Sequence, residues 1–252
     1  MVKKLLKGLL AAKQSRVVSQ YYDFVSSFSS LSPELISGLP PGNNIIVFAP
    51  HCDDEALGCG GTLSKHHLDG HTLTAVFMTD GAQCDSGLSE DEIVQIRMRE
   101  ARQAANVLGI NRCIFLGYPD RRLQKTEETV RRTERILKDV GPDLVYLPFY
   151  LDNHPDHMET AAICLEALRL HPVQTVFFYE VWTTLIPNRL VDITTVMEKK
   201  LEAVRVYRSQ KGIDLFAEKI KSLNRYRSLQ SNHQYSEAFF KVNARDLGKI
   251  PH

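Results

Sequence analysis

Along this chain, short continuous apolar segments alternate with longer stretches whose apolar residues recur every three or four positions. The short segments predict strands buried on both faces of a sheet, and the periodic stretches predict amphipathic helices. Strands are expected at residues 45–49, 73–78, 113–116, 144–147 and 176–179. Helices are expected to end near residue 69 and to span about residues 89–108, 127–139 and 155–170. This alternation predicts an α/β fold, a three-layer αβα sandwich whose mainly parallel sheet has the strand order 3-2-1-4-5.

The segments on either side of this alternating region have other patterns. After residue 192, the periodicity predicts two helices, over about residues 194–208 and 212–229, and a short final segment at 235–242. Near the N-terminus, apolar residues at helical spacing are surrounded by lysines, which fits a helix packed on the domain or one lying on an anionic membrane. We favour packing, and expect an N-terminal helical extension at 1–42 and a single domain at 43–252.

The composition removes several classes of protein. The chain has 252 residues, 43% hydrophobic and 24% charged, which is enough to bury a substantial core. Its net charge of +1 gives no electrostatic basis for binding nucleic acid. No apolar run approaches the roughly 18 residues of a membrane span, and Lys7 interrupts the apolar N-terminal residues, which argues against a secretory signal. Five cysteines without a C-x-x-C pair exclude a disulfide framework and favour a reducing, cytoplasmic setting.

A cluster of glycines after the first strand does not predict a dinucleotide site. Such a site needs its glycines in the turn directly after the strand, where backbone amides meet a pyrophosphate. Here the turn holds His51 and three consecutive carboxylates, and the glycines begin only at Gly58. The carboxylates would repel a pyrophosphate, so we expect the glycines to let the following helix pack closely on the sheet.

Two clusters of polar residues with metal-ligating side chains follow two of the predicted strands. The first is His51-Cys52-Asp53-Asp54-Glu55 after the first strand, and the second is Asp152-Asn153-His154-Pro155-Asp156-His157 after the fourth. Alone, the first cluster fits a solvated acidic turn. In the expected strand order the two strands are neighbours, so both clusters would line one crevice at the carboxyl edge of the sheet. Two histidines and one carboxylate with open positions suit a catalytic zinc ion, and the same ligands can hold ferrous iron.

With these two clusters, the sequence resembles the PIG-L/LmbE-like de-N-acetylase superfamily. The family pattern H-P-D-D-E is similar to residues 51–55, and its H-P-D-H is matched by residues 154–157. The resemblance extends over about residues 44–242. Weaker matches are Thr79-Asp80-Gly81, Arg97-x-x-Glu100, Leu108-Gly109, Leu116-Gly117 with Asp120, Val191-Asp192-Ile193-Thr194, Ser209-Gln210 and Tyr235-x-Glu237-Ala238-Phe239.

The resemblance implies a Rossmann-like fold and zinc-dependent removal of N-acetyl groups, commonly from substrates that contain N-acetylglucosamine. Carried over by position, the metal ligands are His51, Asp54 and His157, the general base is Asp53, and a protonated His154 stabilises the oxyanion. The positions of Arg97 and Asp120 are implicated in sugar recognition. We add that Asp156 is suited to orient His154 or another histidine.

One departure from the family pattern stands within the first motif, where Cys52 replaces the usual proline. We expect a slight change in the rigidity of this turn and no loss of activity. A thiol beside a metal would also confer sensitivity to oxidation or to soft metals.

Several questions stay open from the sequence. The function expected from the resemblance is an N-deacetylase that acts on a linear, non-peptide amide. Two alternatives are a metal hydrolase of another bond, such as a phosphoester, and a non-catalytic sugar-binding protein with the same fold. The group attached to the sugar is open, as are homo-oligomerisation and weak association of residues 1–20 with a membrane surface.

Some side chains outside the two clusters have two interpretations. His66, His67 and His71 are expected to be exposed polar groups near the end of the first helix of the domain, and not metal ligands. Trp182 and Phe177-Phe178 are expected in the core, the alternative for Trp182 being a place at the edge of the crevice.

Overall fold

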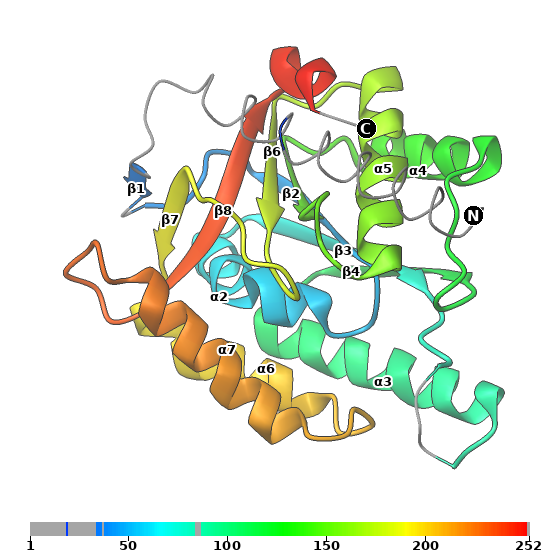
Figure 1. Cartoon of the computed structure of the whole chain (residues 1–252), viewed down its shortest axis with the longest axis horizontal. Coiled ribbons are helices and arrows are strands. Elements are labelled where there is room, and N and C mark those ends of the chain that lie inside the picture. The colour runs from blue at the N-terminus through cyan, green and yellow to red at the C-terminus, as the bar shows by residue number, and fades with distance from the viewer. Residues whose placement is uncertain (1–18, 20–33, 37, 84–86, 251–252) are drawn as a thin grey trace, which may run out of the picture.

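The computed structural model describes residue 19 and residues 34–36, 38–83 and 87–250. The predicted N-terminal helix and Cys84 lie outside these residues. The described part contains one sheet of eight strands, in the order β1-β7-β8-β6-β5-β2-β3-β4 (Figure 1). The strands are β1 (Glu34–Ile36), β2 (Asn44–Ala49), β3 (Thr72–Thr79), β4 (Arg112–Tyr118), β5 (Leu144–Pro148), β6 (Thr175–Tyr179), β7 (Arg189–Asp192) and β8 (Ser236–Asn243).

The parallel part of the sheet confirms the predicted strand order. β4, β3, β2, β5 and β6 are adjacent in that sequence, which is the order 3-2-1-4-5 of the five expected strands. The central strand β2 pairs in parallel with β3 on one side and with β5 on the other, where Ile45 is opposite Leu144. Because β2 is buried on both faces, its apolar run has no polar alternation.

Three strands extend the sheet beyond β6 and were not predicted as strands of this sheet. β8 pairs antiparallel with β6 and with β7, and β1 pairs in parallel with β7. β1 and β7 have three and four residues, which is too short for periodicity to identify them. The predicted final segment at 235–242 corresponds to β8.

Helices cover both faces of the sheet, which confirms the three-layer sandwich. One hydrophobic core contains residues of α2 (Asp54–Leu68), α3 (Glu90–Leu108), α6 (Met197–Val206) and α7 (Ile213–Arg227). The core on the opposite face contains residues of α4 (Glu127–Val140) and α5 (Pro155–Leu170). Figure 1 shows α3, α6 and α7 side by side below the sheet and α4 and α5 together on its other side. Short 3-10 helices occupy Thr194–Val196 and Ala244–Lys249.

Sequence signals at the helix ends act as expected. Ser89 and Glu92 form the predicted capping box at the start of α3, and Gly109 ends this helix in the left-handed region at φ 80°. α5 begins at Pro155, directly after the N-cap residue His154.

The glycines of α2 bring this helix close to the sheet, as expected. A Cβ atom on Gly58 would lie 2.2 Å from Cδ2 of Tyr179, and one on Gly61 would lie 2.7 Å from Ile193. A buried ion pair between Glu237 and Lys200 also contacts the backbone of α2. Glu237 of β8 accepts hydrogen bonds from the backbone N–H groups of Gly61 and Thr62 and contacts the Lys200 ammonium at 2.6 Å.

The expectation for the histidines at the end of α2 is wrong for His66, which is fully buried. Its Nε2 lies 2.9 Å from the Tyr146 hydroxyl and its Nδ1 lies 2.9 Å from Nδ1 of His71. Burial lowers the pKa of His66 to about 3. Its neighbour His67 is exposed, as predicted. Phe177 and Phe178 are in the core, also as predicted.

None of the described helices is both long enough and apolar enough to cross a membrane.

Candidate metal and catalytic site

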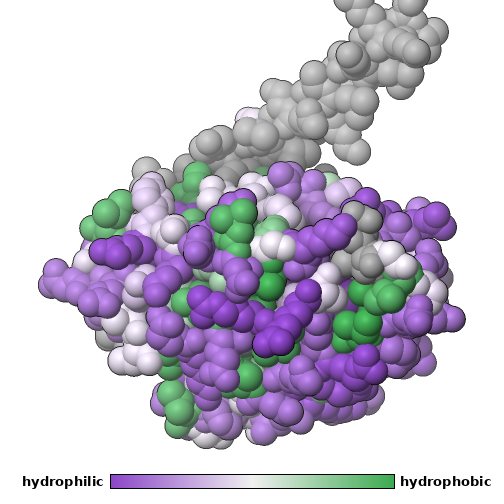
Figure 2. All heavy atoms as spheres, turned by 90° about the horizontal axis from the view of Figure 1, so that it is seen from below, coloured by the Kyte–Doolittle hydropathy of each residue, from purple (hydrophilic) through white to green (hydrophobic). Residues whose placement is uncertain are grey.

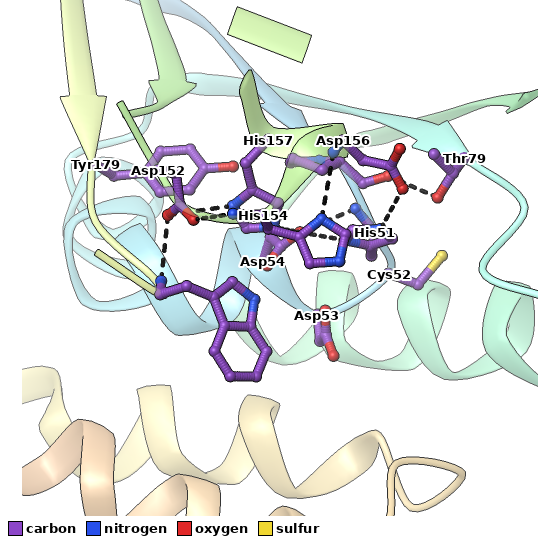
Figure 3. A network of polar contacts seen from close by, with 12 residues as sticks. His51, Cys52, Asp53, Asp54, Thr79, Asp152, His154, Asp156, His157 and Tyr179 are labelled. Atoms are coloured by element: carbon purple, nitrogen blue, oxygen red, sulfur yellow. Dashed lines mark hydrogen bonds and ion pairs between the residues drawn. The ribbon is translucent and has the colours of Figure 1, made fainter. Parts of the chain in front are cut away.

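The two predicted clusters meet at the carboxyl edge of the sheet. The loop after β2 carries His51 to Asp53 and leads into α2, and the loop after β5 leads through His154 into α5. Because β2 and β5 are hydrogen-bonded neighbours, these loops lie side by side although about a hundred residues separate them. Figure 3 shows the imidazoles of His51, His154 and His157 together, with Asp54 between the two loops.

The three residues predicted as metal ligands converge on one point. Oδ2 of Asp54 lies 3.2 Å from Nδ1 of His51 and 3.2 Å from Nε2 of His157. His51, His154 and His157 also each offer a ring nitrogen within 4.8 Å of the others. His157 and Asp54 are buried, and His51 is half-buried.

The first turn of α2 separates the three carboxylates into different environments. Asp54 faces the histidines, whereas the Glu55 side chain is fully buried and its Oε1 accepts a hydrogen bond from the Tyr207 hydroxyl. Burial, with Asp53 nearby, raises the pKa of Glu55 to about 8. Glu55 is therefore separate from the ligand cluster, a division that the run of acidic residues does not reveal.

Asp53 occupies a strained backbone position and lines the cleft. Its φ of 148° lies in a region that residues other than glycine rarely adopt, and this backbone conformation costs on the order of 1–3 kcal/mol. Arg97 stabilises this turn through a 2.7 Å hydrogen bond from its guanidinium to the carbonyl oxygen of Cys52. Oδ2 of Asp53 accepts a 2.9 Å hydrogen bond from the side chain of Gln210 and lies 3.6 Å from the Arg97 guanidinium.

Burial and the negative charge of Asp54 raise the pKa of Asp53 to about 7, although the Arg97 and His51 charges act in the opposite direction. For Asp54 itself, burial raises the pKa, but the contacts with His157 and His51 outweigh it and the pKa is lowered. Two adjacent carboxylates thus have different proton affinities.

His154 is the N-cap residue of α5, and its Nδ1 accepts a 3.3 Å hydrogen bond from the backbone N–H of Asp156. This bond requires an unprotonated Nδ1, so Nε2 carries the proton of the neutral ring. Burial and the nearby His51 and His157 charges lower the pKa of His154. The structure therefore favours a neutral His154 that donates from Nε2, in place of the protonated form expected from the sequence.

Further carboxylates orient the candidate ligands. Asp156 and Asp120 lie 3.0 Å and 3.3 Å from Nε2 of His51, so Asp156 contacts a histidine other than His154. Asp152 lies 3.5 Å from Nδ1 of His157. A carboxylate beside the outer nitrogen of a ligating imidazole fixes the ring and increases its basicity.

The donor set fits a divalent cation. Burial opposes the charged form of His51 and His157, but the surrounding carboxylates raise the pKa of both, that of His157 to about 9. The cluster therefore favours positive charge. Among the described residues, neither ring nitrogen of the fully buried His157 has a hydrogen bond of proper geometry, although both face carboxylates. Such a nitrogen is suited to a metal ligand.

Of the residues of the two clusters, His51, Asp53, Asp54 and His154 line a cleft whose empty space of about 700 Å³ includes open solvent. The two walls differ in character. One wall is polar and includes Arg97 and Asp120, the residues predicted to recognise substrate, with Gln83 and Arg121. The other is apolar, formed by Leu57, Trp182, Ile213 and Phe216.

Two features of the cleft differ from the sequence interpretation. Trp182 is not in the core: it is 51% exposed and lines the cleft, which is the alternative given for it above. Gln210 was quoted only within a weak family match, and its contact with Asp53 depends on the loop between α6 and α7, which no local pattern places at the site.

The thiol of Cys52 is removed from the cleft. The side chain is buried in the core, and Figure 3 shows its sulfur pointing away from the three histidines. Burial raises the pKa of the Cys52 thiol well above its usual value. Both properties oppose reaction with oxidants or soft metals, so the structure does not support the expected sensitivity.

The fold and site define an open α/β protein with a candidate metal-binding group of histidines and carboxylates at the switch point of its sheet. Comparison with known families is more specific: residues 46–168 match the family described as "PIG-L: GlcNAc-PI de-N-acetylase". Residues 46–168 thus form a PIG-L domain, in agreement with the motifs that resemble the PIG-L/LmbE-like superfamily.

Relatives with higher coverage support this assignment. A diacetylchitobiose deacetylase of Thermococcus kodakarensis is 29% identical over 88% of this chain and 92% of its own length. A probable N-acetyl-alpha-D-glucosaminyl L-malate deacetylase 2 of Bacillus anthracis is 28% identical over 72% of this chain and 85% of its own. The structure of N,N'-diacetylchitobiose deacetylase from Pyrococcus horikoshii, in complex with the inhibitor MPG, has a TM-score of 0.75 and 28% identity, covering 81% of this chain and 85% of that one.

Proposed function

We propose that this protein is a metal-dependent N-deacetylase that hydrolyses the acetamide group of an N-acetylglucosamine-type sugar conjugate. The observation that carries the proposal is the convergence of His51, Asp54 and the buried His157 beside a cleft that His51, Asp53 and Asp54 line. The names of the relatives support the same bond and substrate class. The substrate is a small molecule, and we place the enzyme in the cytoplasm because the four described cysteines are all free.

His51, Asp54 and His157 would hold the metal ion, with zinc the first candidate and ferrous iron the second. When bound, such an ion lowers the pKa of a coordinated water to about 7 and polarises the amide carbonyl. Asp120, Asp152 and Asp156 keep the two imidazoles in place through their outer nitrogens.

Asp53 acts as the general base and then as the general acid. It takes a proton from the attacking water and delivers it to the nitrogen of the departing amine. Gln210 and Arg97 hold Oδ2 of its carboxylate, and the side chain lines the cleft. A carboxyl whose pKa is raised to about 7 is suited to exchange protons near neutrality.

His154 stabilises the negative oxygen that forms when water adds to the carbonyl. Its Nδ1 is occupied by the helix cap, so its Nε2–H is the donor. Because this cap hydrogen bond orients the imidazole, the donor needs little reorganisation. Arg97 and Asp120 remain our predicted sugar contacts. Arg97 is only 3% exposed, so its larger contribution is to hold the turn that carries Asp53.

The test is an assay of acetate release from a panel of N-acetylglucosamine conjugates, with phosphoesters as the competing substrates. Asp53→Asn should bind metal as the parent does and lose about a hundredfold or more in kcat. Asp69→Asn, at the exposed end of the same helix, is the matched control and should keep the parent rate. Deacetylation by Asp53→Asn at the parent rate would refute the base assignment. Release of phosphate without acetate, or no turnover by a metal-loaded parent, would refute the proposed reaction.

A further inference from the structure

The apolar wall of the cleft is centred on Trp182, the single tryptophan of the chain. Its side chain is 51% exposed although it lies in the loop directly after β6, beside the candidate metal site. Exposed aromatic surface within a polar cleft is unfavourable in water and is typical of a surface that a ligand covers.

The indole has a fixed position. Its ring packs edge-to-face on Phe216 of α7, with centroids 5.6 Å apart and an interplanar angle of 84°. Its backbone N–H donates a 3.2 Å hydrogen bond to Oδ2 of Asp152, the same oxygen that lies 3.5 Å from Nδ1 of His157. Asp152 thus ties the tryptophan to the candidate metal ligand, so a group that stacks on the indole is held at a set distance from the reacting bond.

The surroundings of this wall fit a carbohydrate ring better than an acyl chain. A pyranose combines an apolar C–H face with a rim of hydroxyls. The cleft has the matching pattern, because Gln210 and Arg121 line it together with the apolar side chains, and Lys219 lies 5.7 Å from the centroid of the Phe216 ring. An acyl chain would require a continuous apolar groove. Seen from the side of α3, α6 and α7, the hydrophobic side chains form separate small groups on a hydrophilic face (Figure 2).

The place of Trp182 suits a ring next to the one that carries the acetamide. Its backbone is tied through Asp152 to the candidate ligand His157, whereas its ring packs on Phe216 of α7. We propose that Trp182, supported by Phe216, forms a second subsite for an uncharged pyranose ring linked to the N-acetylglucosamine unit, so that the substrate is a disaccharide or a longer oligosaccharide. This inference rests on the proposed function and specifies its substrate.

Kinetics of matched substrates test the subsite. Acetate release is measured for N-acetylglucosamine and for N,N'-diacetylchitobiose with the parent, Trp182→Ala, Trp182→Phe and, as a control distant from the cleft, Tyr226→Ala. We expect Trp182→Ala to raise KM for the disaccharide about tenfold or more, with kcat and the monosaccharide kcat/KM each changed less than about threefold. Trp182→Phe should recover part of the loss, because it restores an aromatic face. Equal losses on both substrates, or no change on either, would overturn the inference.

A binding measurement separates this inference from the proposed reaction. In Asp53→Asn, which should not turn over, all tryptophan fluorescence comes from Trp182. Titration with the disaccharide should shift or quench this emission at concentrations about tenfold lower than titration with the monosaccharide. An identical response to both sugars refutes the second subsite. A parent protein that binds the disaccharide in this way but releases no acetate refutes the proposed function and leaves the subsite standing.

Discussion

The buried His66 makes the stability of this protein sensitive to acid. In the unfolded chain its pKa is the ordinary 6.5, and in the folded protein burial, with the His71 and Lys65 charges, lowers it to about 3. Between these values the unfolded chain binds more protons than the folded one, so the stabilising contribution is present above pH 6.5 and is lost as the pH falls toward 3. From the two pKa values, the loss between pH 8 and pH 4 is about 3 kcal/mol.

The geometry gives the physical reason for this loss. In the neutral state one proton is shared between Nδ1 of His66 and Nδ1 of His71, which are 2.9 Å apart. A proton added to His66 would place a positive charge in the core near the His71 and Lys65 charges, and neither described group that contacts the ring, His71 or Tyr146, is a carboxylate that could balance it.

The assay is urea denaturation at several pH values between 8 and 4, with the parent, His66→Gln and His67→Gln. His66→Gln should lose about 1–3 kcal/mol at pH 8, because its hydrogen bonds are imperfectly replaced. Its stability should then fall by about 3 kcal/mol less than that of the parent on going to pH 4. His67→Gln, with an exposed side chain on the same turn, should follow the parent slope. Parallel pH profiles for the parent and His66→Gln would show that His66 does not cause the acid sensitivity.

Two further predictions concern the packing of α2, which carries the site at its N-terminus. Gly58→Ala would place a methyl group 2.2 Å from the Tyr179 ring and should reduce the free energy of unfolding by about 1–3 kcal/mol. In Gly60→Ala the nearest atom to the new methyl group would lie 3.4 Å away, so this variant should keep the parent stability. Equal denaturation midpoints for the two variants would contradict this prediction. Glu237→Gln should destabilise by about 3–5 kcal/mol because it leaves the Lys200 charge buried without its partner. Adding Lys200→Met should recover part of that loss in the same denaturation assay, and a double variant no more stable than the single one would show that the charge is not the cause.

The sequence was sufficient to predict the central fold and the convergence of the site. The apolar runs located β2 and β5, and the handedness and burial rules for parallel sheets made them neighbours. The two polar clusters follow strand ends, where the fold dictates proximity, and the family resemblance selected His51, Asp54 and His157 within them.

What the sequence could not predict depends on contacts between distant segments. Gln210 reaches Asp53 across a separation of 157 residues, and the loop that carries it has no regular pattern. The burial of His66 depends on Tyr146, which lies 80 residues away in β5. Trp182 is in a loop whose path is set by its bond to Asp152, and hydrophobicity alone suggested the core. Each of these required the tertiary structure.

The metal content of the purified protein, measured together with acetate release from an N-acetylglucosamine conjugate, is the decisive test of the proposed site. The proposed site requires about one zinc or ferrous ion per chain, loss of both ion and activity in His157→Ala, and retention of both in His67→Ala. A parent protein that releases acetate at full rate after complete removal of divalent ions, or a His157→Ala variant that keeps its ion, would contradict it.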